Sequence, residues 1–225
     1  MTATSIREFF DQSVDPAVRG FMHIPEAPKG EGFVLTHGAG SNAQAPLLRA
    51  LADTFAEAGY TVLRCDLPYR QTRSFGPPGP GDAARDRAGL RNALAEIRKM
   101  VTGKIFLGGH SYGGRQSSML CAEEPDLVAG LLLLSYPLHP PRKPEQQRTQ
   151  HLPDLRTPTL FVQGTRDPFG SIAEIERAIK MIPGKTKLLT VEGAGHDLGF
   201  KGKGIKDTLP AQVLEDFASL IRANP

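Results

Sequence analysis

The sequence predicts an α/β fold in which helices cover both faces of a mostly parallel central sheet. Short apolar runs alternate with helix-compatible stretches along most of the chain. These runs are apolar almost throughout, which is typical of parallel strands that are buried on both faces. At 225 residues and 40% hydrophobic content, the chain is expected to form one globular domain, residues 1–225, with a sizeable core.

The expected elements alternate in chain order. Strands are expected at Val18–Ile24, Gly32–Thr36, Tyr60–Cys65, Lys104–Gly108, Ala129–Ser135, Thr159–Gln163 and Thr186–Val191. Helices are expected at Pro46–Ala58, Ala83–Met100, Tyr112–Glu123, Ile172–Met181 and Pro210–Ala223. Leu47, Leu51 and Phe55 recur at helical spacing, so they are assigned to the core. Ligands of such a sheet bind beyond the carboxyl ends of its strands.

The most informative motif lies between an expected strand and an expected helix. It reads Gly109-His110-Ser111-Tyr112-Gly113. In this setting the spacing Gly-x-Ser-x-Gly predicts a nucleophile elbow, a turn so tight that glycine is needed two residues to either side of the serine. An ordinary strand-to-helix turn is the alternative, because glycine and serine are common in loops. Two residues further along the chain argue against that alternative.

Those two residues also follow expected strands. Asp167 comes just after Thr159–Gln163, and His196 lies in a glycine-rich loop after Thr186–Val191. The chain order serine, aspartate, histidine is one of the known orders of a catalytic triad, and it differs from the serine-protease orders. The three residue types, their order and their local settings together predict an acyl-transfer site.

Each residue of the expected triad has a physical role. Ser111 is a weak nucleophile unless a base removes its proton, and His196 is expected to be that base. Asp167 is expected to hold the imidazole in the right tautomer. Asp66 and Asp197 are the rival acids, and a helix N-cap is the structural alternative for Asp167.

An oxyanion intermediate needs two hydrogen-bond donors. The backbone N–H of Tyr112, the residue after the serine, is expected to be one of them. The other is expected from the loop after Gly32–Thr36, where we favour the N–H of Ala39 with Gly40 as its neighbouring candidate. His37 precedes this loop, and we expect it to brace the loop by hydrogen bonding.

Composition and charge exclude several classes of function. The net charge is +3, and basic residues are interspersed with acidic ones, so no nucleic-acid partner is expected. No segment resembles a signal peptide or a membrane span, and no membrane partner is expected. Cys65 and Cys121 are expected to be buried thiols, which fits the cytoplasm. No Cys/His spacing resembles a metal site, and no cofactor is expected.

Two loops at the carboxyl edge carry basic residues that could bind substrate. The expected substrate-binding residues are Arg70, Arg73, His139 and Arg142. With Lys143, Lys201 and Lys203, they could form a rim that binds a carboxylate or phosphate. The alternatives are solvation, pairing with Asp82 or Glu145, or an apolar mouth formed by Tyr69, Phe75 and Tyr112. The loop of roughly twenty residues from Tyr136 to Leu155 stands where many hydrolases insert a helical cap, so an open site is expected.

Several stretches resemble the α/β-hydrolase superfamily. They are "THGAG", "RCDLPYRQTR", "GGHSYGGRQSSM", "LSYPLHPPRKPEQQRTQHLPDLRTPTLFVQGTRDPFG" and "GAGHDL". They resemble in particular the bacterial hydrolase-like family related to the testis-expressed and NSL-complex regulatory proteins, which is dienelactone-hydrolase-like. True dienelactone hydrolases have a cysteine where this chain has Ser111, so their substrate is not carried over. "GHSYGG" is also similar to prolyl-oligopeptidase peptidases, but the chain has no room for their β-propeller.

The resemblance implies a serine nucleophile at Ser111, an acid at Asp167 and a base at His196. We therefore expect a serine hydrolase that acts on an ester, thioester or related acyl bond of a small molecule. The alternatives are a non-catalytic protein-interaction module on a hydrolase fold, as in eukaryotic relatives, and a small peptidase or amidase. The natural substrate and the oligomeric state are left open.

Overall fold

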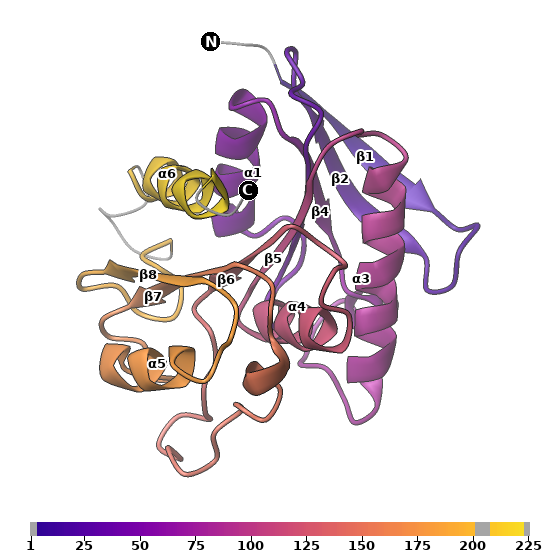
Figure 1. The fold of residues 1–225 in the computed structure, drawn as a ribbon. Coiled ribbons are helices and arrows are strands. Elements are labelled where there is room, and N and C mark those ends of the chain that lie inside the picture. Colours follow the sequence, from indigo (N-terminus) through magenta and orange to yellow (C-terminus); the bar gives the residue numbers. More distant parts are fainter. Residues whose placement is uncertain (1–3, 201–207, 223–225) are drawn as a thin grey trace.

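The computed structural model describes residues 4–200 and 208–222, and its centre is one eight-stranded sheet (Figure 1). The strands are β1 (Ser5–Asp11), β2 (Val18–Ile24), β3 (Gly32–Thr36), β4 (Thr61–Cys65), β5 (Ile105–His110), β6 (Gly130–Leu134), β7 (Thr159–Gly164) and β8 (Thr186–Val191). Their order across the sheet is β1-β2-β4-β3-β5-β6-β7-β8. From β4 to β8 all neighbours are parallel, whereas β2 is antiparallel to both β1 and β4. The mostly parallel sheet expected from the sequence is confirmed.

Helices cover both faces of this sheet. They are α1 (Pro46–Glu57), α2 (Pro68–Thr72), α3 (Asp82–Arg98), α4 (Tyr112–Glu123), α5 (Ile172–Ile179) and α6 (Leu209–Arg222), with a short 3₁₀ helix η1 (Leu152–Asp154). Helices α1 and α6 lie together on one face, and α3, α4 and α5 lie on the other (Figure 1). The α1/α6 side is held by a cluster of aromatic rings, in which Phe33 packs against Phe55 and Phe217. The second core, under α3, α4 and α5, is mainly aliphatic.

All seven expected strands and five expected helices are present, and their ends agree within two residues. Three elements were missed. Strand β1 is an edge strand whose large apolar side chains are exposed, 52% for Ile6 and 56% for Phe10, so it lacks the buried pattern that marks the other strands. Helix α2 and helix η1 are five and three residues long, too short for a helical period to show in the sequence.

The carboxyl ends of the parallel strands bring four connections to one edge of the molecule. These are the segments that follow β3, β5, β7 and β8, which carry the expected site residues. Between β6 and β7 the described chain forms loops and η1, and no helical cap is present among the described residues. Within residues 4–200 and 208–222, no helix has the length and apolar character needed to cross a bilayer.

Candidate active site

Ser111 lies on a strained turn between β5 and α4. Its backbone adopts φ 52° and ψ −116°, a region that side chains with a Cβ rarely occupy. A Cβ on Gly109 would lie 2.6 Å from the carbonyl carbon of Gly113, and one on Gly113 would lie 2.4 Å from the carbonyl oxygen of His37. Only glycine fits these two positions, so the chain folds here as the nucleophile elbow that the sequence predicts.

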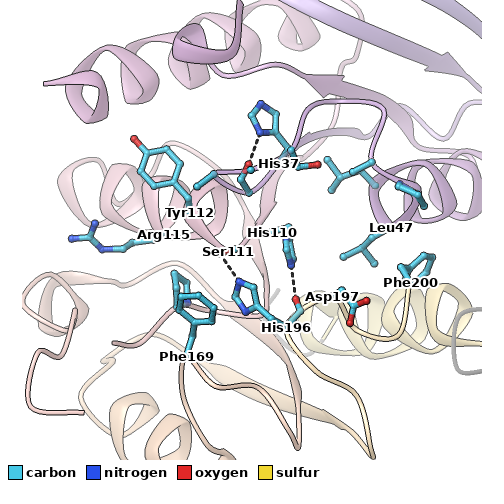
Figure 2. A pocket seen from close by; sticks show the side chains of 18 of the residues that line it. His37, Leu47, His110, Ser111, Tyr112, Arg115, Phe169, His196, Asp197 and Phe200 are labelled. Atoms are coloured by element: carbon cyan, nitrogen blue, oxygen red, sulfur yellow. Dashed lines mark hydrogen bonds between the residues drawn. The ribbon is translucent and has the colours of Figure 1, made fainter. Parts of the chain in front are cut away.

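The three residues of the expected triad form one chain of hydrogen bonds. Nε2 of His196 lies 2.7 Å from Oγ of Ser111 (Figure 2). Nδ1 of the same ring lies 2.8 and 3.0 Å from the two carboxylate oxygens of Asp167. The Asp167 side chain is fully buried, whereas that of His196 is 23% exposed. Oδ1 of Asp167 also accepts the N–H of Phe169 at 2.9 Å, which helps to hold the carboxylate in place. The imidazole therefore has the tautomer needed to accept the proton of Ser111.

The rival acids have other places in the structure. Oδ1 of Asp66 accepts the N–H of Ala43 at 2.7 Å, and Oδ2 pairs with Arg19 at 2.9 Å. Asp66 thus holds the loop after β3. Asp197 directly follows the histidine and lines the cavity. The hydrogen bonds to the imidazole favour Asp167 as the orienting acid.

His37 braces the loop after β3. The backbone N–H of Leu67 donates to Nε2 of His37 at 3.1 Å, so Nδ1 carries the proton and donates to the carbonyl of Gly38 at 2.9 Å. Burial lowers the pKa of His37, which keeps the ring neutral in this arrangement. Because a trans peptide points its N–H opposite to its carbonyl, fixing the Gly38 carbonyl also fixes the direction of the Ala39 N–H, the expected oxyanion donor.

Tyr69 and Arg70 hold the same loop from behind. The hydroxyl of Tyr69 donates to the carbonyl of Ala39 at 2.8 Å. The guanidinium of Arg70 donates over 2.7–3.0 Å to the carbonyls of Ala39, Ser41, Arg73 and Gly76. Arg70 is only 4% exposed and does not line the cavity, which corrects its placement on a substrate-binding rim. Its donors are used on backbone carbonyls, so Arg70 stabilises the loop.

The other expected substrate-binding residues also lie outside the cavity. Arg73 pairs with Asp82 in a partly exposed ion pair. His139 is 5% exposed, and its Nε2 lies 3.5 Å from the carboxylate of Glu174 on α5. Arg142 is exposed on the loop between β6 and β7. Among the described residues, the expected rim is therefore not assembled around the serine, because Arg73 and His139 face carboxylates outside the cavity and Arg142 faces solvent.

The expected apolar mouth is present only in part. Tyr112 lines the cavity, whereas Tyr69 is buried behind the loop and Phe75 is 84% exposed elsewhere. Lys201 and Lys203 lie outside the described residues.

Tyr112 is fixed at both its backbone and its side chain. Its N–H is the first of α4, and the first N–H groups of a helix have no partner within the helix, so this donor is available to an oxyanion. Its hydroxyl donates to Oδ2 of Asp86 at 2.7 Å. Burial and this carboxylate raise the pKa of the Tyr112 hydroxyl, and burial raises the pKa of Asp86. The aromatic ring is thereby held as one wall of the cavity.

His110 is a site residue that the sequence reasoning left without a role. Its Nε2 donates to the backbone carbonyl of His196 at 2.7 Å, and the two rings lie 5.1 Å apart (Figure 2). On the other side of His196 the ring of Phe169 lies 4.2 Å away. Burial lowers the pKa of His110 to about 4, so it stays neutral. His110 and Phe169 together restrict the position of the His196 imidazole.

A cavity of about 820 Å³ opens at the serine, and its two ends differ in character. Arg115 lies to one side of Ser111, and Leu47 and Phe200 lie to the other (Figure 2). Arg148 also lines the cavity, and burial together with the positive charge of Arg115 lowers its pKa. We call Arg115 and Arg148 the basic end of the cavity. No cluster of three or more potential metal ligands occurs within the described part of the chain.

Several solved structures share this fold. A dienelactone hydrolase from Anabaena variabilis superposes with a TM-score of 0.74 at 21% identity, over 96% of this chain and 97% of that one. An α/β serine hydrolase without lid from Xanthomonas campestris superposes with a TM-score of 0.74 at 16% identity, over 100% of this chain and 98% of that one. At these identities the likeness concerns the fold alone.

Sequence comparisons point to the same class of protein. A 2-hydroxy-6-oxononadienedioate/2-hydroxy-6-oxononatrienedioate hydrolase from Pseudomonas sp is 26% identical over 137 residues, which are 60% of this chain and 46% of that protein. The chain spans less than half the length of the curated relatives it matches. The family model described as "Alpha/beta hydrolase domain" matches residues 29–224. With the fold, this match shows that the chain belongs to the α/β-hydrolase family.

Proposed function

We propose that this hydrolase is a serine hydrolase that cleaves an ester, thioester or related acyl bond of a small molecule. One observation carries the proposal: the hydrogen-bonded chain from Ser111 through His196 to Asp167, built on a strained elbow. The strained backbone supports it as well, because such a conformation is retained where function requires it. The cavity that opens at the serine gives an acyl substrate room to bind.

The proposed reaction has two halves. Oγ of Ser111 attacks the carbonyl carbon while Nε2 of His196 takes the hydroxyl proton, and the N–H groups of Ala39 and Tyr112 stabilise the oxyanion. The intermediate collapses to an acyl-enzyme as His196 returns the proton to the departing alcohol or thiol. Water then attacks the acyl-enzyme, with the same base taking its proton, and the carboxylic acid leaves as Ser111 is regenerated.

The surroundings of the triad support the same reading. Asp167 holds the imidazolium that forms in each half of the reaction, and its burial makes that charge interaction strong. Cys65 and Cys121 are both free and buried, as expected from the sequence, and they support a reducing, cytoplasmic setting as part of the proposal.

Hydrolysis of three butyryl compounds with related leaving groups tests the proposal. They are 4-nitrophenyl butyrate, the corresponding 4-nitrothiophenyl thioester and the 4-nitroanilide. A serine hydrolase of this class turns over the ester and the thioester, and Ser111→Ala abolishes both activities while the matched control Ser118→Ala retains them. Turnover of the anilide at a comparable rate would favour an amidase. Absence of turnover with all three compounds would favour the interaction module.

A further inference from the structure

Arg115 projects into the cavity one helical turn after the serine. Its backbone N–H donates to the carbonyl of Ser111 at 2.9 Å, so the two residues lie on the same face of α4. The side chain is half-buried and lines the cavity (Figure 2). Its Nε is buried and has no hydrogen-bond partner among residues 4–200 and 208–222. A buried donor without a partner is costly, which points to a partner supplied by a ligand.

Arg148 reaches the same region from the loop between β6 and β7. Its backbone N–H donates to the carbonyl of Leu138 at 2.7 Å, and its Nη1 donates to the carbonyl of Pro137 at 3.1 Å. The backbone carbonyl of Arg148 accepts the hydroxyl of Tyr136 at 2.7 Å. Burial and the charge of Arg115 lower the pKa of Arg148. Its position is thus fixed by neutral groups, which leave the positive charge uncompensated.

Some other arginines of the molecule are paired with acids. Within the described ranges, Arg19, Arg73, Arg85, Arg87 and Arg91 each form an ion pair with an aspartate or glutamate. Arg115 and Arg148 form no ion pair with a carboxylate of the described residues. Two like charges that line one cavity repel one another and lose hydration, and a bound anion offsets both costs.

We propose that the basic end binds a carboxylate group of the substrate, so that the favoured substrate is an acyl ester or thioester with one anionic arm and one apolar arm. The anionic arm lies against Arg115 and Arg148, and the apolar arm lies along Leu47 and Phe200. Asp197, located near Phe200, disfavours a carboxylate at that end (Figure 2). The substrate assignment rests on the proposed function, but the binding of a carboxylate at the basic end does not.

Two matched pairs of esters test which arm carries the carboxylate. The first pair is mono-(4-nitrophenyl) glutarate and its methyl ester, in which the charge is on the acyl side. The second pair is 4-butyryloxybenzoate and its methyl ester, in which the charge is on the leaving-group side. In at least one pair, the charged member should have a kcat/KM about tenfold to a hundredfold higher than the neutral one, since charge-assisted hydrogen bonds have effects of that order. Equal or lower values for both charged esters would overturn the proposal.

Substitutions then show whether the basic end causes this preference. Arg115→Gln should lower the kcat/KM of the charged ester about tenfold or more relative to that of its neutral partner, because only the carboxylate gains charge-assisted hydrogen bonds from the guanidinium. Arg115→Lys should keep part of the preference, because it keeps the charge without the planar fork. Arg177→Gln, an exposed position on α5, is the matched control and should change neither. A preference that survives in the double variant Arg115→Gln/Arg148→Gln would contradict the proposal.

A binding measurement separates this inference from the proposed function. Ser111→Ala protein is titrated with glutarate by calorimetry, with and without Arg115→Gln. Binding that is lost with Arg115→Gln supports the basic end even if no ester is hydrolysed. Glutarate that does not bind, or inorganic phosphate that binds in preference to it, overturns the carboxylate assignment even if Ser111 hydrolyses neutral esters.

Discussion

The cavity joins two regions that differ in how fully their polar groups are paired. In the serine region, formed by Ser111, His196, Asp167 and the loop 37–41, the polar side chains and the loop carbonyls have partners within the protein. At the basic end, Arg115 and Arg148 carry positive charge with no carboxylate partner among the described residues. A region whose polar groups are paired within the protein favours no particular charge on the substrate. A region with uncompensated positive charge favours substrates that carry a negative charge. Under the proposed function, the first region carries out the chemistry and the second selects the substrate.

The largest effect is expected where the serine region is broken at its centre. Ser111→Ala should lower kcat for charged and neutral esters equally, on the order of 10⁶-fold, because the attacking oxygen is removed. Steady-state assays with both matched ester pairs measure this loss. A loss confined to the charged esters would show that the two regions are not separate in function.

The next effect tests the orienting acid. Asp167→Asn should keep the fold and lower kcat by about 10⁴-fold with either kind of ester, because the imidazole is then held in the wrong tautomer. Asp66→Asn is the control, since Asp66 binds the N–H of Ala43 and the side chain of Arg19. If Asp66→Asn were as damaging while Asp167→Asn were nearly silent, the acid would have been assigned wrongly.

A smaller effect should follow when the support of the oxyanion loop is removed. Arg70→Met leaves the carbonyls of Ser41, Arg73 and Gly76 without their donor, and should lower the free energy of unfolding by about 2–4 kcal/mol. The loosened loop should also lower kcat for charged and neutral esters alike. Urea unfolding and kinetics on both matched ester pairs measure the two effects. A decrease in activity confined to the charged esters would instead show that Arg70 binds substrate.

The pH dependence of stability should report three histidines with lowered pKa values. Burial lowers the pKa of His23, His110 and His151 to about 4 in the folded protein, against about 6.5 in the unfolded chain. The unfolded chain therefore takes up protons first, so stability is full above about pH 6.5 and falls as the pH drops toward 4. His151→Gln removes one of these protons and should lessen the slope by about 1.4 kcal/mol per pH unit. Urea unfolding at pH 7, 5.5 and 4.5 measures the free energy of unfolding at each pH. An unchanged slope in His151→Gln would contradict the lowered pKa of His151.

The smallest effect is expected from the arginines that the sequence placed on the rim. Arg142→Gln and Arg73→Gln should change kcat/KM of every ester by less than about twofold, since both side chains lie outside the cavity and surface charges contribute little. Kinetics at low salt is the most sensitive check. A loss of carboxylate preference in either variant would show that the carboxylate is bound by the rim residues and not by Arg115 and Arg148.

Local signals made the fold and the serine region predictable. Gly109, Ser111 and Gly113 are imposed by one tight turn, and strand order then places the segments after β7 and β8 at the same edge. The bracing role of His37 also followed from its position before the loop. Each of these features depends on a few adjacent residues, and sequence spacing shows such features directly.

The basic end depends on contacts that spacing does not encode. Arg148 lies in an irregular loop, and only the folded path between β6 and β7 brings it near α4. The position of Arg115 could have been predicted in part, because a residue one helical turn after Ser111 on an expected helix lies on the same helix face. Arg70 misled for the opposite reason: a charged residue in a predicted loop suggests exposure, whereas the short helix α2 buries it against four carbonyls.

Covalent labelling measures the reactivity of Ser111 itself. The full chain is treated with a neutral fluorophosphonate, and the modified residue is identified by intact mass and peptide mapping. We expect one adduct, located on Ser111, with none formed in Ser111→Ala. An adduct on Ser117 or Ser118, or ester turnover by a protein whose Ser111 stays unmodified, would contradict it.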